Sequence, residues 1–195
     1  MPAAAPHTHG ATLADLLAVA DEKPYFELID GELAQKAAPS WSHGSIQLGL
    51  GSGLRAQFHR RSGGGGPGGW WILSEVHVAL DDEQVYCPDL AGWRRERVAE
   101  PPHDFPVRLR PDWICEILSP SNASRDTVHK LRGYHRAGVP HYWIVDPAAR
   151  TLTVYRWQAE GYLAVLSAPP PERVRAEPFD AIELSVAAMF GDEDG

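Results

Sequence analysis

Two acidic residues interrupt segments that are otherwise apolar. Glu116 lies within DWICEIL at 112–118, and Asp89 lies within CPDL at 87–90. Side chains alternate along a strand, so a strand over 112–118 has apolar residues on both faces, which predicts an internal strand. An unpaired carboxylate there would cost several kcal/mol, so Glu116 is expected to be neutralised, to meet a cation or to bind a metal.

The two acids can meet if their strands are neighbours. We predict a strand over 84–93, on which Asp89 shares a face with apolar residues. Pro88 lacks a backbone donor and marks an edge, a bulge or a bend. Hard carboxylate oxygens held together in this way suit Mg²⁺ or Mn²⁺, with water completing the shell. Lys130, on the helix that follows the second strand, could orient an attacking water or hold a phosphate oxygen.

The same residues also fit a purely structural interpretation. Asp89 could end a strand at a turn, and Glu116 could meet a core arginine. Asp126 and Lys130 could form an i,i+4 pair on a helix surface, which is common and contributes only a few tenths of a kcal/mol. Spacing alone favours this interpretation. A glycosidase using both carboxylates is disfavoured, since nothing marks a sugar-binding aromatic cleft and Lys130 would have no role.

The flanking segments predict an α/β fold, a mixed β-sheet flanked by helices with β-hairpins at both ends. The order strand, helix, strand over 112–146 is a crossover unit whose two strands should be parallel. Asp30-Gly31 is a two-residue hairpin turn, and a second hairpin is expected near the C-terminus. Interior glycines in the longest helix suggest close packing on the sheet. The helices are predicted over 12–22, 42–60 and about 123–137, with a last turn over 185–190.

Length and composition indicate one globular domain over 11–190, after a disordered lead over 1–10 and before an acidic tail over 191–195. No run approaches the roughly 20 apolar residues of a membrane helix, and no secretory signal is visible, so we expect a cytoplasmic protein with no membrane partner. Cys87 and Cys115 lack metal-site spacing and are expected to be small core residues.

The formal net charge of −8 argues against a protein that simply coats nucleic acid. Part of that charge lies in the acidic tail. Carboxylates that hold divalent cations also lose their repulsion for phosphate, so the charge does not exclude a metal-dependent enzyme that acts on DNA.

Several motifs resemble the PD-(D/E)XK nuclease superfamily and, within it, the Uma2-type branch of restriction-endonuclease-like proteins, long described as a domain of unknown function. The resemblance covers about residues 25–147, with the motifs in the right order. They are YFELIDGEL, Ser42-His43, Pro88-Asp89, EILSPS from Glu116 to Ser121, Arg125-Asp126 with Lys130 and Tyr134, and AGVPHYWIVDP from Ala137 to Pro147.

The resemblance implies a restriction-endonuclease-like core, a Mg²⁺ or Mn²⁺ ion held by Asp89 and Glu116, and hydrolysis of a DNA phosphodiester. The superfamily pattern expects a lysine at position 118, where this chain has Leu118. In the Uma2-type branch that lysine is moved to the following helix, which makes Lys130 the candidate. Glu32, or with less support Glu27, could supply an additional N-terminal acid.

Two alternatives remain open at this stage. Glu32 could equally be a solvated hairpin residue. The whole chain could be a catalytically inactive nuclease-fold module for binding or assembly, with a homodimer as one form of assembly. The negative charge and Leu118 both favour that alternative.

Overall fold

The computed structural model describes residues 10–22, 25–62, 66–119 and 125–192. The helices are α1 (Leu13–Ala18), α2 (Trp41–Phe58), α3 (Leu131–Arg136) and α4 (Val186–Met189), and a π-helical segment, η1 (Arg125–Lys130), leads directly into α3. The strands of the larger sheet are β3 (Trp70–Ser74), β6 (Leu90–Arg94), β7 (Trp113–Ile117), β8 (His141–Asp146), β9 (Thr151–Gln158) and β10 (Gly161–Ala168). The remaining strands are β1 (Phe26–Ile29), β2 (Glu32–Gln35), β4 (Val78–Ala79), β5 (Gln84–Tyr86), β11 (Arg173–Val174) and β12 (Leu184–Ser185).

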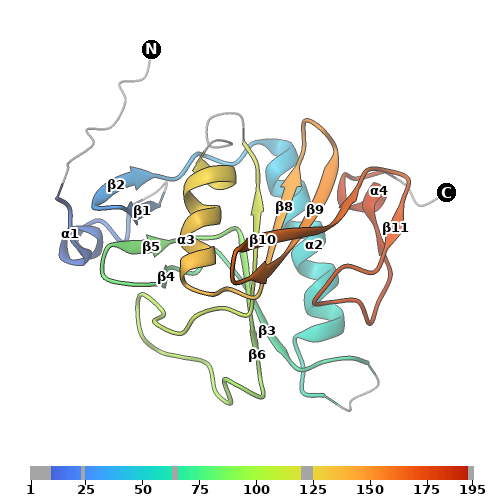
Figure 1. Cartoon of the computed structure of the whole chain (residues 1–195), viewed down its shortest axis with the longest axis horizontal. Coiled ribbons are helices and arrows are strands. Elements are labelled where there is room, and N and C mark those ends of the chain that lie inside the picture. The colour runs from blue at the N-terminus through green and yellow to red at the C-terminus, as the bar shows by residue number, and fades with distance from the viewer. Residues whose placement is uncertain (1–9, 23–24, 63–65, 120–124, 193–195) are drawn as a thin grey trace.

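The larger sheet is mixed, as predicted. Its order over the described residues is β10-β9-β8-β7-β6-β3. Strands β7 and β8 are parallel, which confirms the expected crossover between them, and the other neighbours are antiparallel. The predicted C-terminal hairpin is β9 with β10 (Figure 1).

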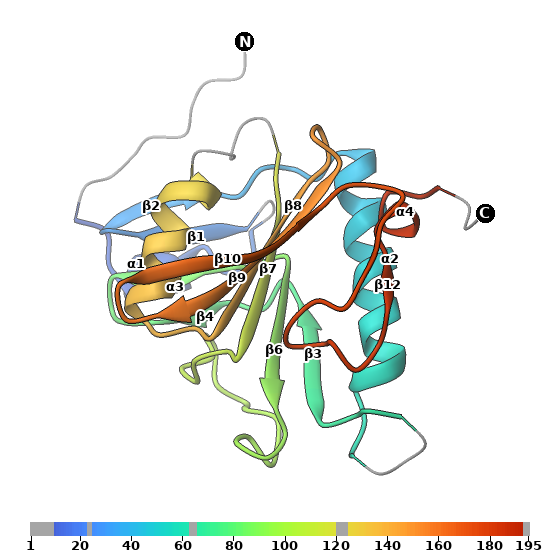
Figure 2. The ribbon, with the colours of Figure 1, turned by 45° about the vertical axis from the view of Figure 1, so that its right-hand side comes forward.

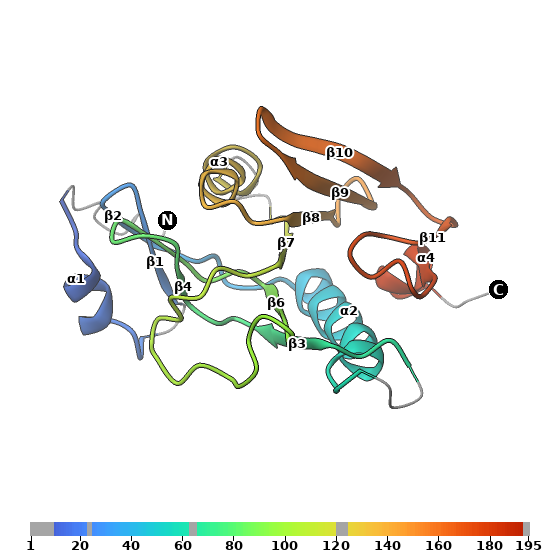
Figure 3. The ribbon, with the colours of Figure 1, turned by 60° about the horizontal axis from the view of Figure 1, so that its bottom comes forward.

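Strand β7 lies inside this sheet and is covered on both faces. Trp113, Cys115 and Ile117 belong to the core cluster that also contains the buried face of α2. Ile114 belongs to a second cluster on the opposite face, with Tyr134 of α3. Figure 3 shows α2 and α3 on opposite sides of β7. Alternation therefore turns Glu116 toward α3.

A smaller antiparallel sheet, in the order β2-β1-β5-β4, lies beside the larger one. Its first hairpin turns at Asp30 and Gly31, which have φ angles of 50° and 74°, as a two-residue turn requires. The register pairs Glu27 with Ala34, and the backbone N–H of Lys36 donates to Tyr25 O at 2.7 Å. Glu27 and Lys36 therefore project from the same face of the hairpin.

The predicted continuous strand over 84–93 is wrong. Strand β5 ends at Tyr86 in the smaller sheet, and β6 begins at Leu90 in the larger one. Pro88 stands between them and has no N–H with which to continue a ladder. The apolar alternation runs through the break, which is why periodicity did not reveal it.

Other boundaries need smaller corrections. Helix α1 is capped by Thr12, as predicted, but ends at Ala18 rather than 22. The predicted lead over 1–10, most of the acidic tail and the first residues of the helix predicted over 123–137 lie outside the described residues. Both cysteines are buried free thiols. Over the described ranges, every helix is too short or too polar to cross a membrane.

The glycines of α2 do not all mark close packing. An added Cβ on Gly51 would lie 3.1 Å from Leu90, but one on Gly53 would meet nothing within 4 Å. The tight approach lies elsewhere, at Gly133 of α3, where a Cβ would lie 2.9 Å and 3.0 Å from two ring carbons of Tyr86.

This contrast gives a stability prediction. Gly133→Ala should lower the free energy of unfolding by about 1–3 kcal/mol, because the buried Tyr86 ring must move. Gly53→Ala, in an open part of a helix, should raise it by about 1 kcal/mol through helix propensity. Urea unfolding measures the free energy of unfolding of both variants. Equal changes in the two would contradict the close contact between α3 and β5.

Candidate active site

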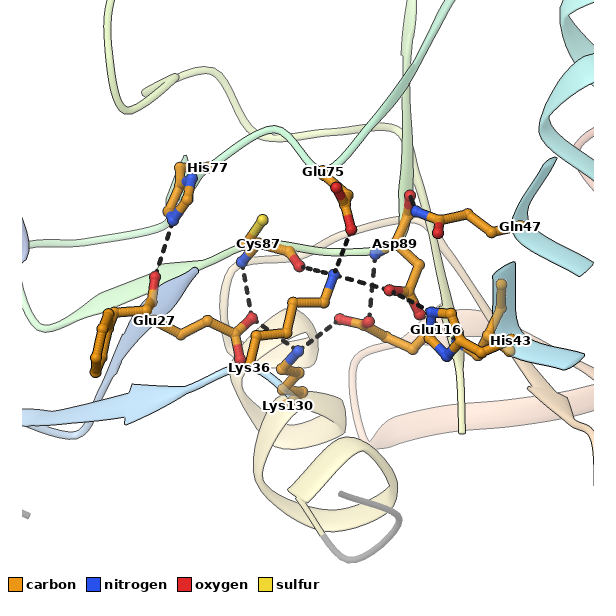
Figure 4. Close-up of polar contacts among 12 residues, drawn as sticks. Glu27, Lys36, His43, Gln47, Glu75, His77, Cys87, Asp89, Glu116 and Lys130 are labelled. Carbon is orange, nitrogen blue, oxygen red and sulfur yellow. Dashed lines mark hydrogen bonds and ion pairs between the residues drawn. The ribbon is translucent and has the colours of Figure 1, made fainter. Parts of the chain in front are cut away.

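The break between β5 and β6 is filled by side chains from other elements. The backbone N–H of Cys87 donates to Glu27 Oε1 at 2.8 Å, and its carbonyl accepts from Lys36 Nζ at 2.9 Å. Both side chains come from the β1–β2 hairpin, which lies beside the break (Figure 4). A glutamate and a lysine thus satisfy backbone groups that would otherwise belong to a sheet ladder.

Asp89 is held in the same manner on the other side of Pro88. Its N–H donates to Glu116 Oε2 at 3.4 Å, and its Oδ2 accepts from the N–H of Ile117 at 2.7 Å. Its carbonyl accepts from Gln47 Nε2 at 3.1 Å. These contacts bring Asp89 beside the end of β7 and next to Glu116.

Two buried lysines connect the acids. Lys36 Nζ lies 2.8 Å from Asp89 Oδ1. Lys130 Nζ lies 2.8 Å from Glu27 Oε1 and 3.0 Å from Glu116 Oε1. Each of these five residues is at most 9% exposed. Such burial is stable only for charges that are paired and hydrogen-bonded, as these are.

The charges of this cluster support one another. Burial alone would raise the pKa of Asp89, but the Lys36 ammonium and then His43 hold it below its usual range. Burial alone would lower the pKa of Lys36, but nearby negative charge, chiefly that of Asp89, raises it above its usual value. Asp89 and Lys36 are therefore an ionised pair at neutral pH.

Two further side chains complete the surroundings of the acids. Tyr134 OH donates to Glu116 Oε1 at 2.7 Å. Burial, followed by the charge of Glu116, raises the pKa of Tyr134, so the phenol keeps its proton. His43, in the first turn of α2, lies with Nε2 3.2 Å from Asp89 Oδ1. Its Nδ1 is buried and has no partner among the described residues.

The residues predicted from the sequence divide into two groups. Asp89, Glu116 and Lys130 line one small pocket of about 10 Å³, together with Lys36 and His43. Lys130 is 2% exposed and therefore does not lie on the surface. The side chain of Asp126, its partner in the structural interpretation, lies outside the described residues.

Glu32 does not line this pocket over the described residues; Glu27 reaches the cluster instead. Both acids project from the same face of the hairpin, but Glu32 pairs with Ile29, nearer the turn. Lys36 was not anticipated. The hairpin register was its available signal, because it places Lys36 on the face that carries Glu27.

The donor set fits a small hard cation. Two carboxylates from Asp89 and Glu116 converge, and Mg²⁺ typically binds through one or two carboxylates while keeping several waters. A ready cluster of three or more His, Cys, Asp or Glu ligands is not formed within the described ranges. A cation would also compete with the Lys36 ammonium for Asp89 Oδ1.

The chain belongs to the Uma2 family, whose profile, described as "Putative restriction endonuclease", matches residues 13–187. Among solved structures it is similar to a crystal structure described as a putative nuclease of the DUF820 group from Anabaena variabilis. The TM-score is 0.73 at 22% identity, over 92% of this chain and 97% of the other. That similarity defines a restriction-endonuclease-like fold. No curated protein matches the chain.

The buried pair of Lys36 and Asp89 gives a stability prediction. Lys36→Met should lower the free energy of unfolding by about 3–5 kcal/mol at neutral pH, because Asp89 would be left as an uncompensated buried charge. The double variant Lys36→Met/Asp89→Asn removes that charge and should recover part of the loss. Chemical unfolding at several pH values measures both variants.

The pH dependence of this loss has a defined sign. In the wild type the pKa of Asp89 is depressed, so its stabilisation is complete above the usual value of about 3.9 and is lost as the pH falls through the folded value. Without Lys36 the pKa rises, so the penalty is largest at neutral pH and shrinks toward acid. A penalty independent of pH would contradict the ion pair.

Proposed function

We propose that the protein is a metal-dependent DNA endonuclease. Asp89 and Glu116 hold Mg²⁺ or Mn²⁺, and Lys130 acts beside them on a DNA phosphodiester. The observation that carries this proposal is the convergence of the three residues in one buried pocket, although they come from the β5–β6 break, β7 and η1. Membership of the Uma2 family supports it.

A divalent cation bound by the two carboxylates would polarise the phosphodiester and lower the pKa of a water molecule that attacks it. The protein groups fix the carboxylates for this role. Lys36 keeps Asp89 ionised, and the N–H of Ile117 orients its second oxygen. Tyr134 and Lys130 orient Glu116 through Oε1.

Lys130 supplies the positive charge that position 118 lacks. Leu118 follows β7, whereas Lys130 ends η1 and points back at Glu116 (Figure 4). Its ammonium could donate to a non-bridging phosphate oxygen and stabilise the negative charge that develops during hydrolysis. Glu27 holds this ammonium from the other side at 2.8 Å and fixes its position.

One observation favours the second candidate, a catalytically inactive binding or assembly module. Asp89 and Glu116 already carry ammonium partners, and both are nearly fully buried. A cluster neutralised in this way can hold the hairpin to the sheet without any metal. In that case the chain would act through its surface, for example by pairing with a second copy.

Cleavage of supercoiled plasmid with Mg²⁺ or Mn²⁺ tests the first candidate. Asp89→Asn and Glu116→Gln should each lower the cleavage rate at least about 100-fold, and Lys130→Met should do so by a similar factor, because each removes charge from the reacting centre. Asp82→Asn, at an exposed turn, is the matched control and should cleave normally. Equal residual cleavage in all variants would point to a contaminating nuclease or to a different site.

Metal titration separates the two candidates without relying on turnover. Mn²⁺ at about 100 times its dissociation constant should stabilise the wild type by about 2.7 kcal/mol and raise its melting temperature. Glu116→Gln should lose most of that shift. Asp82→Asn should keep it. A wild type that shows no shift with either metal would favour the inactive module.

A further inference from the structure

Residues of α2 and β3 line a groove of about 880 Å³. Strand β3 lies at an edge of the larger sheet, beside α2 (Figure 2). Gln47 and Glu75 border the groove at one end. The side-chain amide of Gln47 and the backbone N–H of Glu75 both donate to the carbonyl of Asp89, at 3.1 Å and 3.3 Å. The groove therefore starts next to the candidate active site.

The other end of the groove leads to arginines. Arg55 and His59 line it there, and Arg55 Nη1 lies 3.1 Å from His59 Nδ1. The His59 ring meets Trp71 edge-on, with 5.5 Å between centroids. The guanidinium of Arg95 lies over the same Trp71 ring, 3.3 Å from its centroid. Side-chain contacts thus continue from the groove to Trp71, on the face of β3 that is turned away from α2.

Two further arginines extend this cluster. Arg94 lies over Trp70, 4.6 Å from the ring centroid. Burial lowers the pKa of Arg95, and the positive charge of nearby Arg61 lowers it further. We call Arg55, Arg61, Arg94 and Arg95 the arginine cluster.

The members of the arginine cluster are not paired with acids within the described residues, although Glu96 lines the same surface pockets as Arg61, Arg94 and Arg95. Nearby Arg97, by contrast, pairs with Asp112 at 3.0 Å. Like charges gathered without counterions repel one another, and this occurs in a chain of net charge −8. Stacked guanidinium groups of this kind are suited to phosphate.

The distance from the site to the cluster matches a nucleic-acid backbone. The β3–β6 register pairs Ser74 with Leu90, next to Asp89, and Trp70 with Arg94. Arg94 stands five residues after Asp89, so at about 3.3 Å per residue it lies roughly 17 Å along the chain from that acid. Phosphates on one strand of a duplex repeat about every 3.4 Å along its axis, so roughly five base pairs cover that distance.

We infer that the groove and the arginine cluster form a binding track for the DNA that flanks the scissile phosphate. This inference rests on the proposed function. The arginines contact backbone phosphates, about five base pairs away at Arg94, and take no part in the chemistry. They supply the positive charge that the chain as a whole lacks.

The test measures binding in metal-free buffer, where no cleavage occurs. Fluorescence anisotropy gives the affinity for a labelled random-sequence DNA duplex at several salt concentrations. The double variant Arg61→Ala/Arg95→Ala should bind about tenfold or more weakly, and the slope of log K against log salt should flatten by about 2. Arg108→Ala/Arg136→Ala is the matched control, because these exposed arginines pair with Asp82 and Asp30. Its affinity and slope should equal those of the wild type.

Several results would overturn the inference. They are a wild type that does not bind the duplex at low salt, an unchanged slope in the Arg61/Arg95 variant, and an equal loss in the Arg108/Arg136 control. Arg95→Lys keeps the positive charge but changes the side chain that covers Trp71. If Arg95 acts by contacting phosphate, the salt slope of this variant should equal that of the wild type. Arginine-dependent binding by a wild type that never cleaves DNA would refute the proposed function and leave the track standing.

Discussion

The structure depends on how the chain passes from one sheet to the other at Cys87, Pro88 and Asp89. Buried backbone groups need partners, and Pro88 cannot donate. Glu27 and Lys36 hold the Cys87 peptide groups, and Glu116 accepts from the Asp89 N–H. The side chains that would carry out the chemistry therefore also join the smaller sheet to the larger one, so the fold and the candidate site are built from the same contacts.

This double role sets the electrostatics of the pocket. Three carboxylates and two ammonium groups are buried together. Lys130 lies between Glu27 of β1 and Glu116 of β7, and Lys36 pairs with Asp89. Buried ion pairs are weak contributors to stability, because desolvation offsets much of their attraction, and apolar residues of similar volume often serve as well. A fold that only needed to join two sheets could use a simpler contact than Glu27, Lys130 and Glu116. Under the proposed function, this buried charge would serve the bound cation and the phosphate.

The sequence could predict the local parts of this arrangement but not the connections between distant segments. Alternation around Glu116 indicated a covered strand, and Asp30-Gly31 indicated the hairpin, because both signals lie within a few residues. The break at Pro88 was hidden, since apolar alternation continues through it from one sheet into the other. Glu27 and Glu32 share a face of the hairpin, so periodicity could not separate them. Only the packing of the hairpin against η1 brings Glu27, rather than Glu32, to Lys130.

Net charge is a poor guide to whether this chain binds nucleic acid, because it is a sum over the surface while binding responds to the local field. The acids of the pocket are matched by Lys36 and Lys130, so they do not repel a phosphate as isolated carboxylates would. The arginine cluster lies beyond them, across the groove, without carboxylate partners over the described residues. On the proposed track, a phosphate backbone would meet the cluster first and then reach a pocket whose own charge is nearly balanced. The value of −8 is thus a sum over the whole chain and does not describe the surface along which a polyanion would approach Asp89 and Glu116.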